Sequence, residues 1–552
     1  METRTLQAEI DRRRTFAIIS HPDAGKTTLT EKLLLYGGAI HLAGSVRARR
    51  DQRATTSDWM ELEQERGISV SSTVLQFEYG GCVINLLDTP GHRDFSEDTY
   101  RVLAAVDSAV MVIDAAKGVE ERTRKLFEIC RLRGVPIFTF VNKMDRPARE
   151  PLELLAELEA VLGVAAAPVT WPLGSGPDFR GVYDRRTGHL HLYERLAAGS
   201  YRAPERMTGL GDPELQRQFA GAGYDAWLEE VEMIEGAGEA FDAARVANGT
   251  LTPVFFGSGL TNFGVQLLLD TFVEHGARPQ ARRSGDRLVP PDEEAFSGLV
   301  FKVQANMNPR HRDRLTFVRV CSGVFQKDMV VADPSSGKPV RLSYPQKLFA
   351  QQRESLERAY PGDIVGLVAH RGFPIGATLT ADPAIRYDEI PRFPPEVFVF
   401  VRSEGNDRRK QFDDGLAQLV AEGVIQCFTS RRGGPTDRIL GAVGRLQFDV
   451  MEHRLIHEYG AKPHLEPAPF ACVRWLGPET TDAALQQTHL GSGVLQAQDD
   501  RGLPVLLFDS VWATDYFARQ HPAMTLHALS SGPATIAPVR GKSPPGHLAT
   551  DG

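Results

Sequence analysis

The chain has 552 residues, of which 42% are hydrophobic and 24% are charged, a composition typical of globular proteins with about three domains. Its formal net charge is −8, so the protein as a whole does not attract nucleic acid. Any RNA contact must therefore come from local basic patches. The apolar runs are too short for a membrane span or a signal peptide, which predicts a cytoplasmic protein without a membrane partner.

The first predicted strand, residues 15–20, leads through a loop into a helical pattern that begins at Lys26. The loop carries Gly25, Lys26 and Thr27, which supply what a phosphate chain needs: close backbone approach, positive charge and a hydroxyl for Mg²⁺. Ser20 departs from the standard pattern, which has glycine at this position. The predicted phosphate-binding residues are Ser20, His21, Pro22, Asp23, Ala24, Gly25, Lys26, Thr27 and Thr28.

A long polar stretch, residues 42–66, follows and ends in Arg66-Gly67-Ile68-Ser69. In a nucleotide switch such a segment becomes ordered when a hydroxyl reaches Mg²⁺ and the γ-phosphate, and Ser69 is the candidate hydroxyl. The alternative is a solvent-exposed loop whose arginines only make it soluble. Both interpretations can apply to the same segment, because basic side chains on a switch loop could also contact RNA. The arginines are Arg47, Arg49, Arg50 and Arg53.

The second predicted strand, residues 83–87, is followed directly by Asp88-Thr89-Pro90-Gly91-His92. A carboxylate at a strand end can hold Mg²⁺ through water, and Gly91 can offer an unhindered N–H to a γ-phosphate. In isolation this run is better explained as an ordinary turn. Because His92 directly follows Gly91, we predict that it acts on the attacking water, as a base or by positioning it. The predicted catalytic residues are His92, Lys26 and Gly91.

The sequence Asn142-Lys143-Met144-Asp145 follows the predicted strand 137–141. The Asp145 carboxylate can accept both N–H donors of the Watson–Crick edge of guanine, an arrangement that adenine does not offer. Ser258, Gly259 and Leu260, after the run 254–256, could close the other side of the base, although a plain turn explains this short motif almost as well. Three motifs in this order, each after a strand, predict that the chain binds GTP and GDP. The predicted GTP-binding residues beyond the phosphate loop are Asp88, Thr89, Pro90, Gly91, His92, Asn142, Lys143, Asp145, Ser258, Gly259 and Leu260. The predicted Mg²⁺ ligands are Thr27 and Ser69, which bind directly, and Asp88, which binds through water.

The remaining patterns give the domain organisation. A strand at residues 109–113 and a helix at 121–133, which Gly134 ends, complete a doubly wound, mostly parallel sheet. We therefore expect an α/β P-loop GTPase domain followed by a β-barrel domain and an α+β domain. The expected limits are 1–280 for the GTP-binding domain, 281–295 for a linker, 296–388 for the barrel, 389–530 for the α+β domain and 531–552 for a disordered tail.

The five cysteines are scattered, without the spacing of a disulfide framework or a metal site. We predict free thiols, mostly buried in apolar surroundings. They are Cys82, Cys130, Cys321, Cys427 and Cys472.

The phosphate loop, the Arg-Gly-Ile-Ser segment and the histidine after the Asp-x-x-Gly glycine together resemble those of the ribosomal GTPases. Longer passages resemble the peptide chain release factor 3 family, and the resemblance extends through most of the chain. These passages are residues 86–100, 107–120, 301–307 and 444–448.

The resemblance implies a three-domain GTPase that binds the ribosome after peptide release and, with GTP, promotes departure of the class I, stop-codon-reading release factor. It also implies contacts with ribosomal RNA and proteins, no DNA partner and a monomer. In such proteins Pro22 and Ile68 would flank His92 as an apolar gate, and Lys143 would lie along the purine.

Two other functions stay open at this point. An elongation-factor-G-like GTPase is the first, but that family carries additional C-terminal domains for which this chain has no room. A regulatory GTP-binding switch is the second, and it would not need the predicted barrel. The basic segments 308–314 and 431–434 could meet RNA phosphates, or they could be solvated loops.

Overall fold

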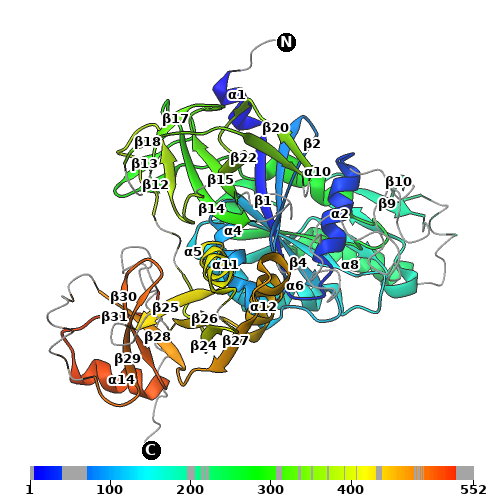
Figure 1. Ribbon diagram of the computed structural model, residues 1–552. Helices are drawn as coiled ribbons and strands as arrows, with labels where there is room; N and C mark the ends of the chain where they lie inside the picture. The colour runs from blue at the N-terminus through cyan, green and yellow to red at the C-terminus, as the bar shows by residue number, and fades with distance from the viewer. Residues whose placement is uncertain are drawn as a thin grey trace, which may run out of the picture.

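The computed structural model describes most of the chain in three parts, which are coloured from blue to red in Figure 1. The described residues are 5–39, 71–194, 205–212, 223–305, 314–333, 337–349, 352–369, 372–388, 392–405, 407–430, 438–477 and 490–529, with positions 215, 217, 390, 480, 485 and 488.

The first part is built on a mostly parallel sheet, as predicted. The strand order is β2 (Thr73–Tyr79), β3 (Cys82–Asp88), β1 (Arg13–Ser20), β4 (Ser108–Asp114), β5 (Ile137–Asn142), β11 (Leu251–Phe256) and β6 (Ala165–Pro168). Within this order β2 is antiparallel to its neighbour β3, whereas the other pairs are parallel. Every residue of β1 is buried, as expected for a strand covered on both faces.

Alternate residues of β1 point to opposite faces of this sheet, and each face has its own helices. Ile19 belongs to a core with α4 (Ser96–Leu103) and α5 (Glu121–Leu132), while Ile18 belongs to a core with α2 (Lys26–Tyr36) and α10 (Val265–His275). Gly134, with φ of 66°, follows the end of α5. The predicted strands and helices of this part are therefore confirmed.

A small antiparallel unit, which the sequence patterns did not predict, follows α6 (Pro151–Leu162) and β6. Its strands are β7 (Thr170–Leu173), β8 (Gly181–Asp184), β9 (His189–Tyr193) and β10 (Glu205–Gly209), in the order β10-β9-β8-β7. The helices α8 (Tyr224–Ala237) and α9 (Ala243–Ala247) lead back to β11. This unit lies beside the carboxyl end of β5, where it supports one of the site loops described below.

The second part is the predicted barrel-like domain of short strands. They are β14 (Ser297–Ala305), β15 (Arg314–Ser322), β16 (Phe325–Gln326), β17 (Val330–Ala332), β18 (Pro339–Arg341), β19 (Pro345–Phe349), β20 (Gln352–Ser355), β21 (Arg358–Ala359), β22 (Ile364–Ala369) and β23 (Thr378–Thr380). They enclose a core that includes Val300, Val318 and Val365. The segment predicted as a plain linker contains a hairpin, β12 (Arg282–Ser284) and β13 (Arg287–Val289), whose three-residue strands are too short to give a periodic pattern.

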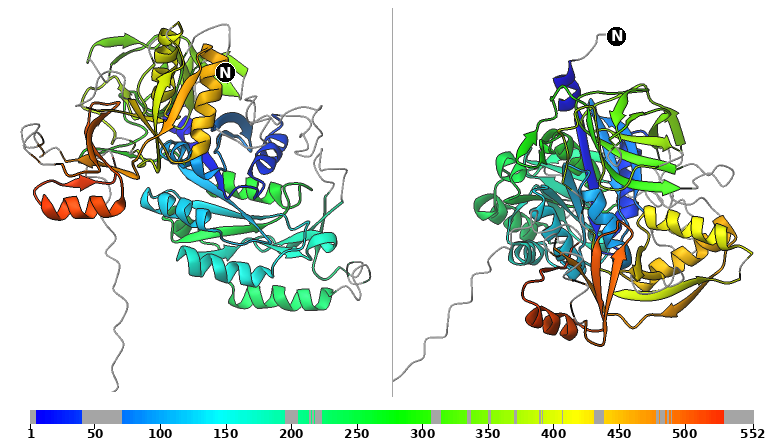
Figure 2. Two further views of the ribbon diagram at one scale, coloured as in Figure 1. Left: turned by 60° about the horizontal axis from the view of Figure 1, so that its bottom comes forward. Right: turned by 60° about the vertical axis from the view of Figure 1, so that its left-hand side comes forward.

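The third part mixes strands and helices, as predicted. Its sheet has the order β27 (Pro463–Pro467), β24 (Val397–Ser403), β26 (Arg438–Ala442), β25 (Gln426–Ser430), β29 (Val494–Asp499), β30 (Pro504–Phe508), β28 (Cys472–Leu476) and β31 (Leu526–His527). Its helices are α11 (Arg409–Ala421), α12 (Arg445–Tyr459) and α14 (Val511–Gln520). Figures 1 and 2 show α11 and α12 side by side. Helix α12 contacts the 3₁₀ helix η1 (Arg93–Phe95), and the turn after α11 contacts α4.

Candidate functional site

The predicted motifs gather at one edge of the sheet, because each follows the carboxyl end of a parallel strand. Ser20 ends β1, Asp88 ends β3 and Asn142 ends β5. The loop after β11 joins them at the same edge through hydrogen bonds to Asn142 and Asp145. Tertiary structure thus brings together segments that lie far apart in the chain.

The phosphate-loop motif forms a tight turn between β1 and α2. Gly25 has φ of 94° and forms the N-cap of α2, so the first N–H groups of the helix face the loop. An added Cβ at Gly25 would lie 2.4 Å from Nδ2 of Asn142, so both the backbone conformation and the space require glycine. Ser20 does not have a positive φ, and its hydroxyl donates to the carbonyl of His21 at 2.8 Å. The departure from glycine at Ser20 therefore costs no backbone strain.

Lys26 and Asp88 form a buried ion pair at the start of α2. The ammonium Nζ contacts the carboxylate Oδ1, and both side chains are almost inaccessible to solvent. The neighbouring Thr89 hydroxyl donates to the carbonyl of Ile18 at 2.7 Å, which fixes the end of β3 to β1. The charged groups predicted to bind phosphate and metal are thus held side by side.

Asn142 connects three of the site loops through one amide group. Its Nδ2 donates to the carbonyl of Ala24 at 2.8 Å, and its Oδ1 accepts from the N–H of Lys143 at 2.9 Å and of Gly259 at 2.8 Å. The residue is 2% exposed, so these bonds are shielded from water. The phosphate loop, the Asn-Lys-Met-Asp loop and the loop after β11 are consequently fixed to one another.

Asp145 is oriented by the loop after β11. The hydroxyl of Ser258 donates to Oδ1 of Asp145 at 2.6 Å, and the N–H of Met144 donates to the carbonyl of Gly257 at 3.1 Å. Leu260, the last predicted residue of this loop, is half-buried. The segment that sequence alone could explain as a plain turn therefore lies against the residue predicted to read the base.

Lys143 lies over the phosphate loop, with φ of 72°. Its Nζ donates to the backbone carbonyl of Asp23 and to Oδ2 of Asp114, the latter at 2.8 Å. Burial alone would raise the pKa of Asp114, but the hydrogen bonds from Lys143 and from the N–H of Ala116 and the lysine charge outweigh it, so this pKa lies below its usual value. Asp114 was missed from sequence, since an aspartate at the end of β4 carries no motif of its own.

His92 directly precedes η1, and its side chain is 39% exposed, whereas the other predicted catalytic side chain, Lys26, is almost inaccessible. Its Nδ1 accepts from the N–H of Asp94 at 3.2 Å. Gly91, directly before it, approaches the phosphate loop so closely that an added Cβ would lie 3.6 Å from Cα of Pro22. The histidine therefore stands next to the place where the Asp-x-x-Gly loop meets the phosphate loop.

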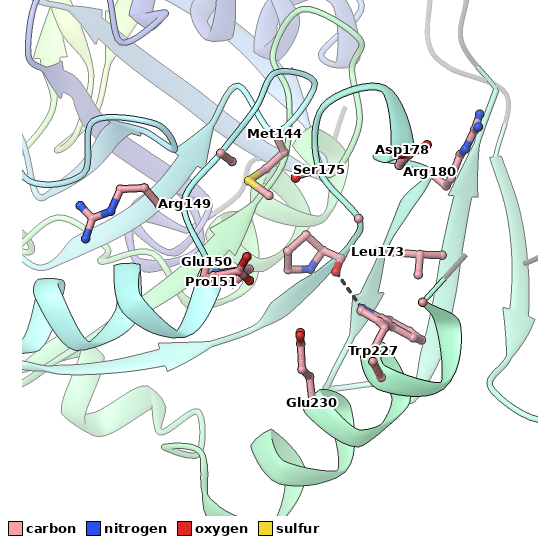
Figure 3. Close-up of a pocket in the computed structure, with 15 residues that line it drawn as sticks. Met144, Arg149, Glu150, Pro151, Leu173, Ser175, Asp178, Arg180, Trp227 and Glu230 are labelled. Carbon is pink, nitrogen blue, oxygen red and sulfur yellow. Dashed lines mark hydrogen bonds between the residues drawn. The ribbon is translucent and has the colours of Figure 1, made fainter. Parts of the chain in front are cut away.

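A cavity of about 490 Å³ lies beside the Asn-Lys-Met-Asp loop, between the start of α6 and α8 (Figure 3). Met144 lines it, and the N–H of Gly176 donates to the Met144 carbonyl at 2.8 Å. On the opposite wall, Nε1 of Trp227 donates to the carbonyl of Pro172 at 2.8 Å, the bond that Figure 3 marks. The small antiparallel unit thus supports the loop that carries Asp145.

Several sequence predictions lie outside the described residues. They concern Ser69 and Ile68, the arginines of residues 42–66, most of the basic segment 308–314, the segment 431–434 and the tail 531–552.

The described part of the chain has no helix with the length and apolar character of a membrane span. It also contains no cluster of three or more His, Cys, Asp or Glu side chains that could bind a metal by itself. The hydroxyl of Thr27 and the carboxylate of Asp88 form an oxygen-only donor set, which fits Mg²⁺ when phosphate and water supply the other oxygens. All five cysteines are free, as predicted.

Family models match the chain in three consecutive segments. Residues 11–277 match the elongation factor Tu GTP binding domain, residues 295–382 match elongation factor G domain 2, and residues 387–518 match the class II release factor RF3 C-terminal domain.

Curated relatives match over nearly the whole chain. A protein of Rippkaea orientalis named peptide chain release factor 3 is 53% identical and covers 95% of this chain and 97% of its own length. A protein of the same name from Gloeobacter violaceus is 52% identical, over 96% of this chain and 100% of its own. Among solved structures, a Thermus thermophilus protein has a TM-score of 0.66 at 24% identity, covers 89% of this chain and 72% of its own, and supports the fold alone.

Proposed function

The chain belongs to the peptide chain release factor 3 family, and we propose that it recycles class I release factors after peptide release. It is a GTPase of translation termination, as its GTP-binding part and its relatives indicate. The observation that carries the proposal is the match of residues 387–518 to the C-terminal domain of class II release factors, because the other two matched segments are shared with elongation factors.

We assign the nucleotide contacts as follows. Asp145 accepts the N–H groups of guanine while Ser258 fixes its carboxylate, and the N–H groups of Gly259 and Leu260 close the base site. Lys143, which already lies over the phosphate loop, covers the purine. The phosphates lie on the N–H groups of the loop that ends in α2, with Lys26 neutralising their charge. The Asp88–Lys26 ion pair keeps this ammonium in place.

Mg²⁺ is the metal that this donor set fits. Thr27 would bind it directly, Asp88 through water and Ser69 through its hydroxyl in the GTP-bound state, as the sequence predicts. When bound, the metal neutralises charge that develops on the phosphate oxygens.

His92 is the proposed catalytic residue. It directly follows Gly91, whose N–H is assigned to the γ-phosphate, and its accessible side chain leaves a partner free to move it. Hydrolysis requires an attacking water held in line and stabilisation of the developing charge, so His92 acts by positioning that water or by accepting its proton. We infer that the ribosome supplies the contact that moves the histidine, and that the protein works as a cytoplasmic monomer.

The test uses ribosomes stalled at a stop codon with a limiting amount of class I release factor. Peptide released per molecule of release factor is measured with this protein and GTP, with the protein and a non-hydrolysable GTP analogue, and without the protein. Several turnovers of the release factor that require both the protein and GTP are expected. Ribosome-stimulated GTP hydrolysis without a gain in turnover would keep the GTPase but reject the recycling role.

A further inference from the structure

The N-cap of helix α12 is Gly444, which has no side chain to cap the first turn. Gln447 of the helix accepts from the N–H groups of Val443 and Gly444, and the carboxylate of Asp94, from η1 in the GTP-binding part, caps the N–H of Leu446. Oδ2 of Asp94 accepts from the N–H of Leu446 at 2.9 Å. The contact joins residues 352 positions apart in the chain and places a negative charge at the positive end of the helix dipole.

The same carboxylate faces His92. The N–H of Asp94 donates to Nδ1 of His92 at 3.2 Å, and this backbone bond holds the imidazole. Oδ1 of Asp94 lies 3.5 Å from the same nitrogen, which is already an acceptor and makes no hydrogen bond to the carboxylate. The imidazole therefore points forward along the chain, toward η1, and meets the ring of Phe95 edge-on at 6.2 Å between centroids. Asp94 is thus the group that touches both the proposed catalytic histidine and the third part of the molecule.

The contact between η1 and α12 is close and specific. An added Cβ at Gly444 would lie 2.0 Å from Cγ of Asp94, although the extended backbone of Gly444 is open to any residue. Phe95 packs with Val450 of α12 in a small apolar cluster, and both side chains are buried. A side chain at position 444 would therefore displace the Asp94 carboxylate, whereas the chain path itself accepts any residue.

We propose that Asp94 is a positioning residue for GTP hydrolysis, which holds His92 on η1 for as long as α12 lies against it. The proposal rests on the catalytic role assigned to His92 above. When α12 withdraws, the carboxylate loses the N–H of Leu446 and η1 loses this anchor. The backbone N–H that holds His92 is then free to move, and the histidine is released to turn toward Gly91 and the γ-phosphate. The position of the third part of the molecule thereby controls the position of the catalytic side chain.

Arg122, in the first turn of α5, gives the released carboxylate a second partner. Its guanidinium nitrogens are buried with no hydrogen-bond partner among the described residues. Burial lowers the pKa of Arg122 to about 10, while the charge of Asp94 raises this pKa and the charge of Arg93 lowers it. The guanidinium keeps its charge at neutral pH, and it is available to Asp94 in the released state.

Three variants of the full chain separate the parts of this contact. Asp94→Ala removes the carboxylate, and Gly444→Ala displaces it without removing any polar group. Asp94→Asn keeps both contacts, because the amide oxygen can accept from the N–H of Leu446 and the backbone N–H of residue 94 still donates to Nδ1 of His92. Gly491→Ala is the matched control, since its added Cβ would meet no atom within 4 Å.

Multiple-turnover hydrolysis of GTP without ribosomes is the first measurement. Asp94→Ala and Gly444→Ala are expected to raise the rate about tenfold, the effect of losing one hydrogen bond to a charged group from a two-state equilibrium. Asp94→Asn and Gly491→Ala should match the unchanged protein. The double variant Asp94→Ala, His92→Ala should lose the increase, because Asp94 acts through His92.

The second measurement is the ¹⁵N resonance of His92 Nδ1 in histidine-labelled protein with bound GDP, assigned by its loss in His92→Ala. It should move in Asp94→Ala and Gly444→Ala and stay in place in the two other variants. An unmoved resonance, or a moved one without faster hydrolysis, overturns the proposal. Normal ribosome-stimulated hydrolysis by His92→Ala would instead refute the catalytic role of His92, and the resonance distinguishes these two failures.

Discussion

At the scale of single residues, the choice of base depends on one carboxylate and the hydroxyl that orients it. Asp145 is only partly buried, yet Ser258 fixes Oδ1 at 2.6 Å from its hydroxyl. Ser258 is itself held in place, because its Oγ accepts from the N–H of Thr261 at 3.2 Å. The carboxylate is therefore oriented before the nucleotide binds. This orientation favours a base that presents two N–H donors to it.

We expect Asp145→Asn to reverse the preference from guanosine to xanthosine nucleotides, by roughly 100-fold or more, because one acceptor becomes a donor. Competition between labelled GDP and unlabelled xanthosine diphosphate measures this preference. Ser258→Ala is the companion variant, and it should weaken binding of both nucleotides without changing which is preferred. Continued preference of Asp145→Asn for GDP would show that another group reads the base.

At the scale of elements, the end of α11 is tied to α4 by one arginine. Gly423 follows the helix with φ of 72°, and Nη1 of Arg101 donates to the carbonyls of Glu422 at 3.4 Å and Gly423 at 3.3 Å. The other end of the same guanidinium is paired with Glu97 at 2.6 Å. Since α4 follows the Asp-x-x-Gly loop in the chain, this contact is a second connection between that loop and the third part.

We expect Gly423→Ala to lower the free energy of unfolding by about 2 to 3 kcal/mol, from the left-handed backbone together with the displaced guanidinium. The added Cβ would lie 2.2 Å from Nη1 of Arg101. Gly502→Ala is the control, because its φ is 82° and its Cβ would meet no atom within 4 Å, so it carries the strain without the collision. Thermal unfolding should show a larger fall in Tm for Gly423→Ala, and equal falls would argue against a role for the Arg101 contact.

At the scale of the whole molecule, the barrel is fixed to the GTP-binding part by a buried ion pair. Arg319 of β15 is 1% exposed, and its Nη2 lies 2.5 Å from Oδ2 of Asp107, just before β4. Around it the hydroxyl of Thr15 donates to the carbonyl of Gly362 at 2.6 Å, and the same carbonyl accepts from Arg319. Such a pair adds little net stability, but removing one partner leaves a buried charge.

We therefore expect Arg319→Met to lower the free energy of unfolding by about 3 to 5 kcal/mol, because Asp107 is left charged and buried. Urea-induced unfolding measures the change. Adding Asp107→Asn should recover part of the loss, and Arg278→Met, which breaks the exposed pair with Asp11, should cost at most about 1 kcal/mol. A loss for Arg319→Met no greater than that for Arg278→Met would contradict the proposed role of the pair.

The nucleotide, the class of fold and the family could be predicted from the sequence, because short motifs after strands indicate the first two and contiguous passages indicate the third. The sequence could not identify Asp114, since a lone aspartate after β4 becomes informative only when Lys143 is placed against it. It also missed the small antiparallel unit and the hairpin of residues 282–289, whose strands are too short to give a clear period.

How the motifs are held together depends on contacts between segments that lie far apart in the chain. The Asn142 amide joins segments 118 and 117 positions away in the chain, and Asp94 reaches α12 across 352 positions. The residues around such a contact do not reveal it in the sequence. Gly444 is one of 51 glycines, and Asp94 could equally be a solvent-exposed carboxylate. Only the packing of α12 on η1 shows that the two residues meet. Local spacing therefore encodes the chemistry, whereas long-range packing sets the geometry in which that chemistry takes place.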